Sequence, residues 1–155
     1  MKLEFIFTGK TTEKYLEEGI AIYSKRLKHY LTSDVTIIPS GSAVKSREVV
    51  MKSESDAILK KITDRDFVIL LDERGKEMNS VQLSELMNKS MVNGVTKIVL
   101  IVGGAFGVSE EIRKRANLVL SFSKFTLTHQ MIRIFILEQV YRAMTIIRNE
   151  SYHHS

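Results

Sequence analysis

The chain alternates between two hydrophobic spacings, one that repeats every two residues and one that repeats every 3.6 residues. Short apolar runs predict five strands, at residues 3–7, 35–38, 67–71, 97–102 and 118–122. The third and fourth runs are almost wholly apolar, which is typical of parallel strands that are covered on both faces. Amphipathic segments separate the runs. The pattern therefore predicts an α/β fold, with a mostly parallel sheet and helices on both of its faces.

The first predicted helix carries one continuous apolar stripe, at positions i, i+4, i+7, i+11 and i+14. The stripe consists of Leu16, Ile20, Tyr23, Leu27 and Tyr30. Further helices are predicted at about 46–62, at 80–92 and from Ser109 onward. We expect Thr11 or Thr12 to cap the first helix and Ser80 to cap the third, because short hydroxyl side chains are favoured at that position. Gly75 is expected to end the turn after the third strand.

The last predicted helix, at about 129–148, differs from the others because apolar residues occupy most of its circumference. A surface helix needs only one apolar stripe, so this helix must be covered on more than one side. The sheet can cover one side. A second copy of the chain, related by twofold symmetry, is the simplest cover for the other, and we expect a homodimer. Burial within a single monomer is the alternative.

Length and composition restrict the possibilities further. At 155 residues the chain is expected to form a single domain, residues 1–155. It has no cysteine, which excludes disulfides and a cysteine nucleophile, and no metal site is predicted. No apolar run approaches the roughly 18–20 residues that span a bilayer, and the N-terminus does not resemble a signal peptide. We expect a cytoplasmic protein without membrane contact. The net charge of +5 gives mild support for a polyanionic partner.

Two apparent nucleotide-binding motifs fail on spacing. Gly9-Lys10-Thr11 resembles the end of a phosphate-binding P-loop, but the first glycine of that pattern would fall on Glu4. The residues Gly103-Gly104-x-x-Gly107 lack the G-x-G-x-x-G spacing of a dinucleotide fold. Hydrolysis of ATP or GTP and binding of a dinucleotide are therefore not predicted.

Three loops remain, at 71–76, 102–107 and 120–129, and each follows the carboxyl end of a predicted buried strand. Open α/β sheets bind ligands at that edge. The glycines of the second loop would let a flat ligand lie against bare backbone. Each loop alone is equally compatible with a structural turn. Their joint occurrence after three successive strands predicts a ligand site.

The third loop, the segment Glu138-Gln139-Val140-Tyr141-Arg142-Ala143 and the ending Tyr152-His153-His154 resemble the RlmH family of the SPOUT superfamily. The resemblance spans almost the whole chain. Members of that family methylate N3 of a pseudouridine in the 23S RNA of the large ribosomal subunit, with S-adenosylmethionine as the methyl donor. The resemblance further implies homodimers and a C-terminal trefoil knot, which is an exceptional feature among folds.

By this resemblance, the cofactor lies in the knot and is held largely by backbone hydrogen bonds and apolar side chains. The implied cofactor-binding residues are Leu71, Gly103, Phe122, Ser123, Lys124, Phe125, Thr126 and Leu127. One departure concerns Thr128, where the family usually has proline. Proline restricts φ to about −65° and threonine does not, so we expect a looser cofactor loop.

The candidate catalytic residues are His129, Arg142, Tyr152 and His153, and the general base is not assigned to any one of them. Two have structural alternatives. His129 begins a helix and is also placed to hydrogen-bond the backbone, and Arg142 follows Glu138 by four residues, the spacing of an intrahelical ion pair. We expect the tail of one protomer to complete the active site of the other, with Tyr152 and His153 contacting an extruded base.

No added RNA-binding domain accompanies the catalytic fold, so we expect the assembled ribosome to present the target. Two other functions stay open. One is a non-catalytic dimer that binds RNA or the ribosome on the same scaffold, and the other is a SPOUT methyltransferase that acts on tRNA. The basic charge is compatible with all three.

Overall fold

The structure is a computed structural model that describes residues 1–41 and 46–153. In these ranges strands and helices alternate, as predicted, and no helix is long and apolar enough to cross a membrane. In chain order the elements are β1 (Lys2–Thr8), α1 (Lys14–Leu27), β2 (Thr32–Ile38), α2 (Arg47–Leu59), β3 (Phe67–Glu77), α3 (Ser80–Val92), β4 (Lys97–Val102), α4 (Glu110–Arg115), β5 (Leu118–Ser121) and α5 (Met131–Ile147).

The strands form one parallel sheet in the order β2-β1-β4-β3-β5. Val102 at the end of β4 lies beside Phe7 of β1 on one side and beside Leu71 of β3 on the other. Leu71 in turn pairs with Leu120 of β5. The loops that follow β1, β3, β4 and β5 therefore start from the same edge of the sheet.

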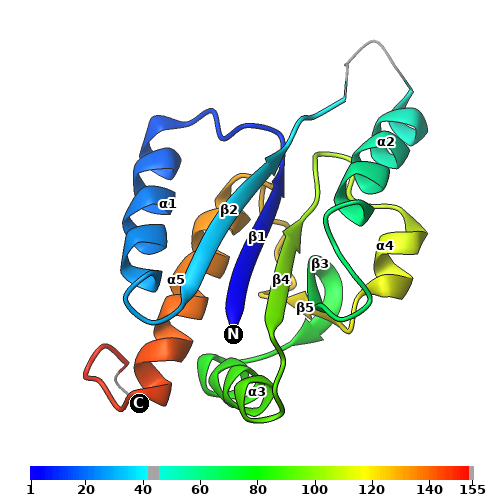
Figure 1. The fold of residues 1–155 in the computed structure, drawn as a ribbon. Helices are drawn as coiled ribbons and strands as arrows, with labels where there is room; N and C mark the ends of the chain where they lie inside the picture. The colour runs from blue at the N-terminus through cyan, green and yellow to red at the C-terminus, as the bar shows by residue number, and fades with distance from the viewer. Residues whose placement is uncertain (42–45, 154–155) are drawn as a thin grey trace.

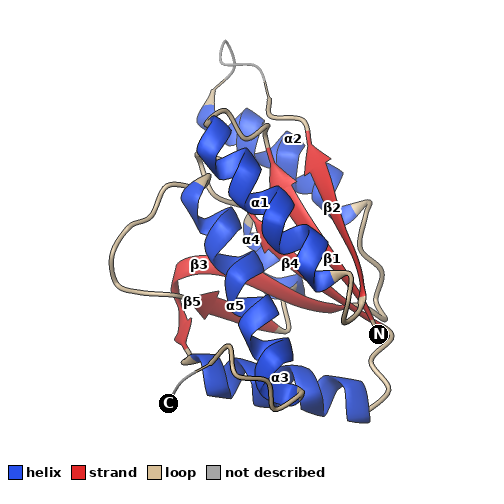
Figure 2. Ribbon diagram, turned by 90° about the vertical axis from the view of Figure 1, so that its left-hand side faces the viewer, coloured by secondary structure: helices blue, strands red, loops and turns tan. Residues whose placement is uncertain are grey.

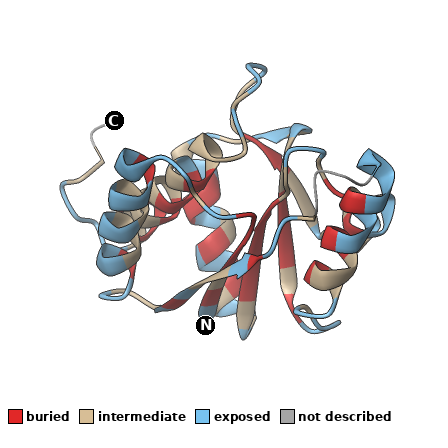
Figure 3. Cartoon of the chain, turned by 90° about the horizontal axis from the view of Figure 1, so that it is seen from above, coloured by how far each residue is buried: buried red, intermediate tan, exposed pale blue. Residues whose placement is uncertain are grey.

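Helices cover both faces of the sheet, which confirms the predicted α/β arrangement (Figure 1). On the first face, α1, α3 and α5 pack on side chains that include Phe5, Phe7 and Leu100. On the second face, α2 and α4 pack on side chains that include Ile6 and Val99. The view from above shows that the buried residues concentrate on the strands between the two helical layers (Figure 3). The alternation along each strand thus supplies two separate cores.

The last helix, α5, lies against both α1 and α3 on the first face (Figure 2). Its buried residues are Arg133, Ile136, Leu137, Val140, Ala143, Met144 and Thr145. The prediction that this helix is covered on more than one side is confirmed, and within one chain the cover comes from the sheet, α1 and α3. Phe135 remains 42% exposed on the same helix.

The third strand is longer than the apolar run that predicted it. Gly75 does not end a turn, as we expected, but lies within β3, which continues to Glu77 after an irregularity in its pairing with β5. The reason for glycine is close approach to the neighbouring strand, because a Cβ atom at Gly75 would lie 2.6 Å from the carbonyl oxygen of Val119.

The predicted helix caps are wrong in two places. The residue before α1 is Glu13, whose side chain makes no capping bond, and Thr12 instead donates from its backbone to Oε1 of Gln130 at 2.8 Å. The helix α3 is capped by Asn79, which forms a reciprocal capping box with Gln82. The hydroxyl of Ser80 donates to Gln139 of α5 at 2.7 Å. Tertiary partners therefore replace the local capping bonds that the sequence suggested.

Candidate functional site

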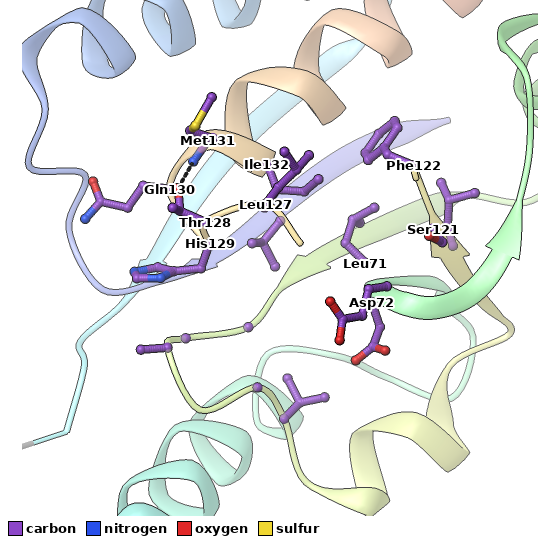
Figure 4. Close-up of a pocket in the computed structure, with 18 of the residues that line it drawn as sticks. Leu71, Asp72, Ser121, Phe122, Leu127, Thr128, His129, Gln130, Met131 and Ile132 are labelled. Carbon is purple, nitrogen blue, oxygen red and sulfur yellow. Dashed lines mark hydrogen bonds between the residues drawn. The ribbon is translucent and has the colours of Figure 1, made fainter. Parts of the chain in front are cut away.

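The strands β1 and β4 are neighbours, yet the helices that follow them, α1 and α4, cover opposite faces of the sheet. The two loops at their carboxyl ends therefore diverge and leave a crevice, which is where open α/β sheets bind ligands. A cavity of about 940 Å³ lies at this edge. Its walls include residues 71–74 within β3, the glycine loop after β4 (residues 103–107), the connection from β5 to α5, and the start of α1 (Figure 4).

Most of the predicted cofactor-binding residues line this cavity. Those that do are Leu71, Gly103, Phe122, Ser123, Phe125 and Leu127. The two that do not are Lys124, whose Nζ lies 3.7 Å from Glu77 Oε1, and Thr126, whose hydroxyl donates to Glu73 Oε2 at 2.9 Å. The three predicted loops, distant in sequence, thus meet in one place. Which of their atoms contact a ligand stays a prediction.

The glycine loop presents bare backbone to the cavity. A Cβ atom at Gly103 would lie 2.9 Å from Cγ1 of Val108 and 3.1 Å from the carbonyl carbon of Gly107, closer than real Cβ atoms approach other atoms without displacing them. Gly103 therefore has no room for a side chain, because the loop packs on itself there, and it lines the cavity with backbone alone.

The serine hydroxyl groups of the third loop form hydrogen bonds with the backbone of the same loop. Ser121 donates from its hydroxyl to the carbonyl oxygen of Ser123 at 3.0 Å, and Ser123 Oγ accepts from the backbone N–H of Phe125 at 2.9 Å. These bonds organise the backbone after β5 without secondary structure. They leave the backbone, together with the apolar side chains of Phe122 and Leu127, to face the cavity.

Asp72 also lines the cavity, although it was not among the predicted site residues. Its carboxylate forms an ion pair with Arg113 of α4 and accepts from the backbone N–H and Nε of Arg74, at 3.0 and 3.1 Å. Burial alone would raise the pKa of Asp72, but these donors outweigh it and lower the pKa to about 2. The ionised carboxylate ties α4 to the cavity wall.

Arg133 is the second residue that sequence reasoning missed. It is fully buried in α5, and its guanidinium donates to the carbonyl oxygens of Thr8 and Gly9 at 2.5 and 3.0 Å and to the hydroxyl of Thr11 at 2.9 Å. Its Nε donates to the carbonyl oxygen of His129 at 3.1 Å. All these partners are neutral oxygens. Arg133 therefore joins the start of α5 to the loop after β1.

The start of α5 forms one wall of the cavity. His129 lies there, and burial together with the nearby Arg133 lowers its pKa below the usual value. Its neighbour Thr128 is hydrogen-bonded to the first turn of the helix. The Thr128 hydroxyl oxygen accepts from the backbone N–H of Met131 at 3.1 Å (Figure 4). The Thr128 carbonyl oxygen accepts from the backbone N–H of Ile132, also at 3.1 Å. The hydroxyl thus provides a restraint that a proline at this position could not.

The other three catalytic candidates do not line the cavity of their own chain, and two of them, Arg142 and Tyr152, lie together. Arg142 donates from Nε and Nη2 to Glu138 Oε1, at 3.0 and 2.6 Å, so the intrahelical ion pair is present. The hydroxyl of Tyr152 donates to the same oxygen at 3.1 Å, and the Arg142 guanidinium lies 4.7 Å from the ring centroid of Tyr152. Burial raises the pKa of Tyr152, and contacts with Tyr23 and Glu138 raise it further.

His153 follows in the same tail, and its Nδ1 atom is buried without a hydrogen-bond partner among the residues that the structure describes. The tail is held against α5 by Tyr152, which contacts Glu138 and Tyr141. No group of three or more His, Asp or Glu side chains in residues 1–41 and 46–153 is arranged to hold a metal ion.

Comparisons with known proteins agree with this architecture. Residues 1–153 match the family model described as "Predicted SPOUT methyltransferase". The chain is 45% identical over 156 residues to a protein of Christiangramia forsetii and 43% identical over 155 residues to one of Cytophaga hutchinsonii. Each match covers 99% of this chain and at least 99% of the relative, and both relatives are named ribosomal RNA large subunit methyltransferase H.

Solved structures show the same fold at low sequence identity. A probable methyltransferase from Bordetella pertussis Tohama I aligns over 92% of this chain and 93% of its own, with a TM-score of 0.59 and 7% identity. A probable methylase family protein from Haemophilus influenzae Rd KW20 aligns over 96% of this chain and 66% of its own, with a TM-score of 0.56 and 11% identity. The resemblance seen in the sequence is confirmed, and the chain belongs to the SPOUT methyltransferase family.

Proposed function

We propose that this protein methylates N3 of a pseudouridine in the 23S RNA of the large ribosomal subunit, with S-adenosylmethionine as the methyl donor. The observation that carries the proposal is that three loops, distant in sequence, converge on one cavity. This cavity lies where the loops after β1 and β4 diverge. Relatives of the same length that are 37–45% identical carry a name that states large-subunit rRNA methylation. The whole chain would act as a single SPOUT-type domain in the cytoplasm.

The cavity fits S-adenosylmethionine. Leu71, Phe122 and Leu127 supply apolar walls for a flat ring, and Gly103 lines the cavity with backbone alone. With Ser123, Lys124, Phe125 and Thr126, these residues would hold the cofactor. When bound, the cofactor supplies a methyl group on a positively charged sulfur. No metal is part of the proposal.

The protein's own contribution would be to place the target nitrogen and to remove its proton. Among the candidates only His129 lines the cavity of its own chain. The lowered pKa of its imidazole favours the neutral form, which can accept a proton. Arg142 and Tyr152 form a separate cluster on the same chain, and His153 follows Tyr152 in the tail. They would take part only if a second copy brought its cluster to the cavity.

We therefore propose a homodimer in which the tail of one protomer completes the partner's site. The exposed aromatic ring of Phe135 on α5 supports a partner on this helix. The test mixes two variants, one that lacks residues 152–155 and one in which Leu127→Glu disables cofactor binding. If the sites are shared, mixed dimers regain methylation that neither variant shows alone. Two inactive variants that stay inactive after mixing would contradict shared sites.

The proposal includes the trefoil knot. It is supported by the path of the chain after β5, because β5 lies at an edge of the sheet whereas Gln130 and Arg133 bind the loop after β1, beyond β3 and β4. Pulling the chain from both ends in an optical trap tests it. A knot leaves the extended chain shorter than its full contour length, and an extension to the full length would contradict the knot.

Methyl transfer is the direct test of the function. Labelled S-adenosylmethionine is offered with assembled ribosomes, naked rRNA and bulk tRNA in parallel. We expect label in the large-subunit rRNA of assembled ribosomes and little in the other two. Label in tRNA would overturn the substrate but keep the enzyme class. Ribosome binding without label in any RNA would favour a non-catalytic RNA-binding dimer.

A further inference from the structure

Part of the cavity wall comes from outside the three segments assigned to the cofactor. Tyr15 reaches it from α1 on the first face of the sheet, and Met51 from α2 on the second. Phe106 lines it as well; it belongs to the loop 102–107 but is not among the predicted cofactor-binding residues. The volume of about 940 Å³ is near the upper end of the roughly 300–1,000 Å³ typical of small-molecule sites. The cavity therefore has walls, and room, for a second occupant beside a cofactor.

Exposed aromatic rings gather at this cavity. Among the described residues the exposed phenylalanine and tyrosine side chains are Tyr15, Phe106, Phe125 and Phe135, and all but Phe135 line it. Single exposed apolar residues are common on protein surfaces, but here three exposed rings line one cavity. Aromatic rings that are open to solvent at a cavity are suited to stack on a planar ligand.

Phe106 has a cationic neighbour. The guanidinium of Arg47, the first residue of α2, lies 5.4 Å from the centroid of the Phe106 ring. The ring is 43% exposed, so Arg47 leaves part of its surface open. A ring that stacks on a base next to a cation that can meet a phosphate is the combination that proteins use to hold unpaired nucleotides.

We propose that Phe106 and Arg47 form the binding site for the extruded target nucleotide, with the base stacked on Phe106 and Arg47 contacting an adjacent phosphate. The inference rests on the proposed function, since it assumes an RNA substrate. A base taken out of its helix needs a stacking surface to offset the lost stacking of its neighbours. Phe106 provides this surface on the cavity that would hold the methyl donor.

The first test compares Phe106→Ala with Phe106→Trp, which retains an aromatic ring. Three quantities are measured: the dissociation constant for S-adenosylmethionine, the dissociation constant for assembled large subunits, and the KM and kcat of methyl transfer. For Phe106→Ala we expect the dissociation constant for large subunits and the KM to rise about 5- to 100-fold, the effect of losing one base–aromatic stack. The kcat should stay unchanged, because an interaction that is equally strong in the ground state and the transition state affects KM alone. Cofactor affinity should change less than about twofold, and Phe106→Trp should restore subunit binding because it retains an aromatic ring.

The matched control is Val81→Ala, which truncates a side chain of similar exposure on α3 that does not line the cavity. It should leave all three quantities unchanged. Weaker cofactor binding by Phe106→Ala would overturn the proposal by assigning the ring to the cofactor, and unchanged subunit binding would overturn it as well. If the wild type methylated no RNA, the proposed function would fail, and subunit binding would still decide the role of Phe106.

Arg47 is tested by salt dependence. Loss of one phosphate contact lowers the slope of log Kd against log salt by about 0.7–0.9. We expect this reduction for Arg47→Gln and a nearly unchanged slope for Arg47→Lys, which keeps the charge. An unchanged slope for Arg47→Gln would remove the phosphate contact from the proposal.

Discussion

The guanidinium of Arg133 lies 2.5 Å from the carbonyl oxygen of Thr8, a residue 125 positions earlier in the chain. The same group reaches Gly9, so a buried cation in the last helix satisfies carbonyl groups at the end of the first strand. Burial lowers the pKa of Arg133, which reflects the cost of holding a charge there. The hydrogen bonds must offset that cost, and they align the start of α5 with the cavity.

Replacing this residue should destabilise the fold. Arg133→Met retains most of the apolar volume but leaves buried carbonyl oxygens without donors, and we expect the free energy of unfolding to fall by roughly 2–5 kcal/mol. Urea unfolding measures the change. The control is Arg74→Met, because the Arg74 side chain is 70% exposed and solvent screens its ion pair, so its loss should change stability little. A more stable Arg133→Met would show that the buried charge costs more than its hydrogen bonds return.

Thr128 should hold the cofactor loop through its hydroxyl. Thr128→Val preserves the shape of the side chain but removes the acceptor of the Met131 N–H, which is worth about 0.5–2 kcal/mol by analogy with helix caps. We expect S-adenosylmethionine to bind about 2- to 30-fold more weakly, measured by titration calorimetry. Thr128→Pro also loses this hydrogen bond, but the proline ring restricts the backbone. Its affinity for S-adenosylmethionine, compared with that of the wild type, therefore shows whether the ring or the hydrogen bond restrains the loop more strongly. Unaltered binding by Thr128→Val would exclude a role for the hydroxyl.

The Asp72 carboxylate predicts an acid-sensitive component of stability. Because its pKa is depressed to about 2 in the folded protein, the unfolded state binds more protons between that value and its ordinary pKa near 3.8. The stabilisation is complete above about pH 4–5 and is lost as the pH falls toward 2. Asp72→Asn should therefore show a smaller loss of stability over this range. Parallel pH profiles for both proteins would contradict the assignment.

Gly75 should tolerate no side chain. In Gly75→Ala the new Cβ would press on the backbone of Val119, so β3 and β5 would have to separate beside the cavity. Gly94→Ala is the matched control, because Gly94 has open space around it and only its positive φ of 75° opposes a side chain, at a cost of about 1–2 kcal/mol. We expect the larger loss of thermal stability at Gly75. Equal losses would mean that the strands adjust freely.

Arg142 should matter for activity more than for stability. Its ion pair with Glu138 is partly exposed, so Arg142→Gln should change the free energy of unfolding by less than about 1 kcal/mol. Loss of a group that assists proton removal typically slows a reaction about 10²- to 10⁴-fold. Methyl-transfer rates under saturating substrate test this, with Lys2→Gln as the control, because Lys2 forms an exposed ion pair with Asp34 and does not line the cavity. A rate near that of the wild type would assign Arg142 to the ion pair alone.

The fold was predictable because its signals are local. Apolar runs such as 97–102 become strands covered on both faces, and the stripe that begins at Leu16 becomes the buried side of α1. The same logic brought the three ligand loops to one edge, since parallel strands share their carboxyl ends. Predictions that depended on a distant partner failed. Thr12 pairs with Gln130 instead of capping α1, and Gly75 accommodates the backbone of Val119.

By itself, the sequence determined the alternation of strands and helices, the edge of the sheet at which a ligand would bind, and the family resemblance. Only the tertiary structure decided what holds that edge together. Among the apolar residues at the start of α5, Arg133 gives no sign of its partners in the sequence, because the oxygens that it binds at Thr8 and Gly9 belong to backbone more than 120 residues away. Likewise, the separation of Arg142 and Tyr152 from the cavity depends on the path of the chain after β5, which hydrophobic periodicity does not encode.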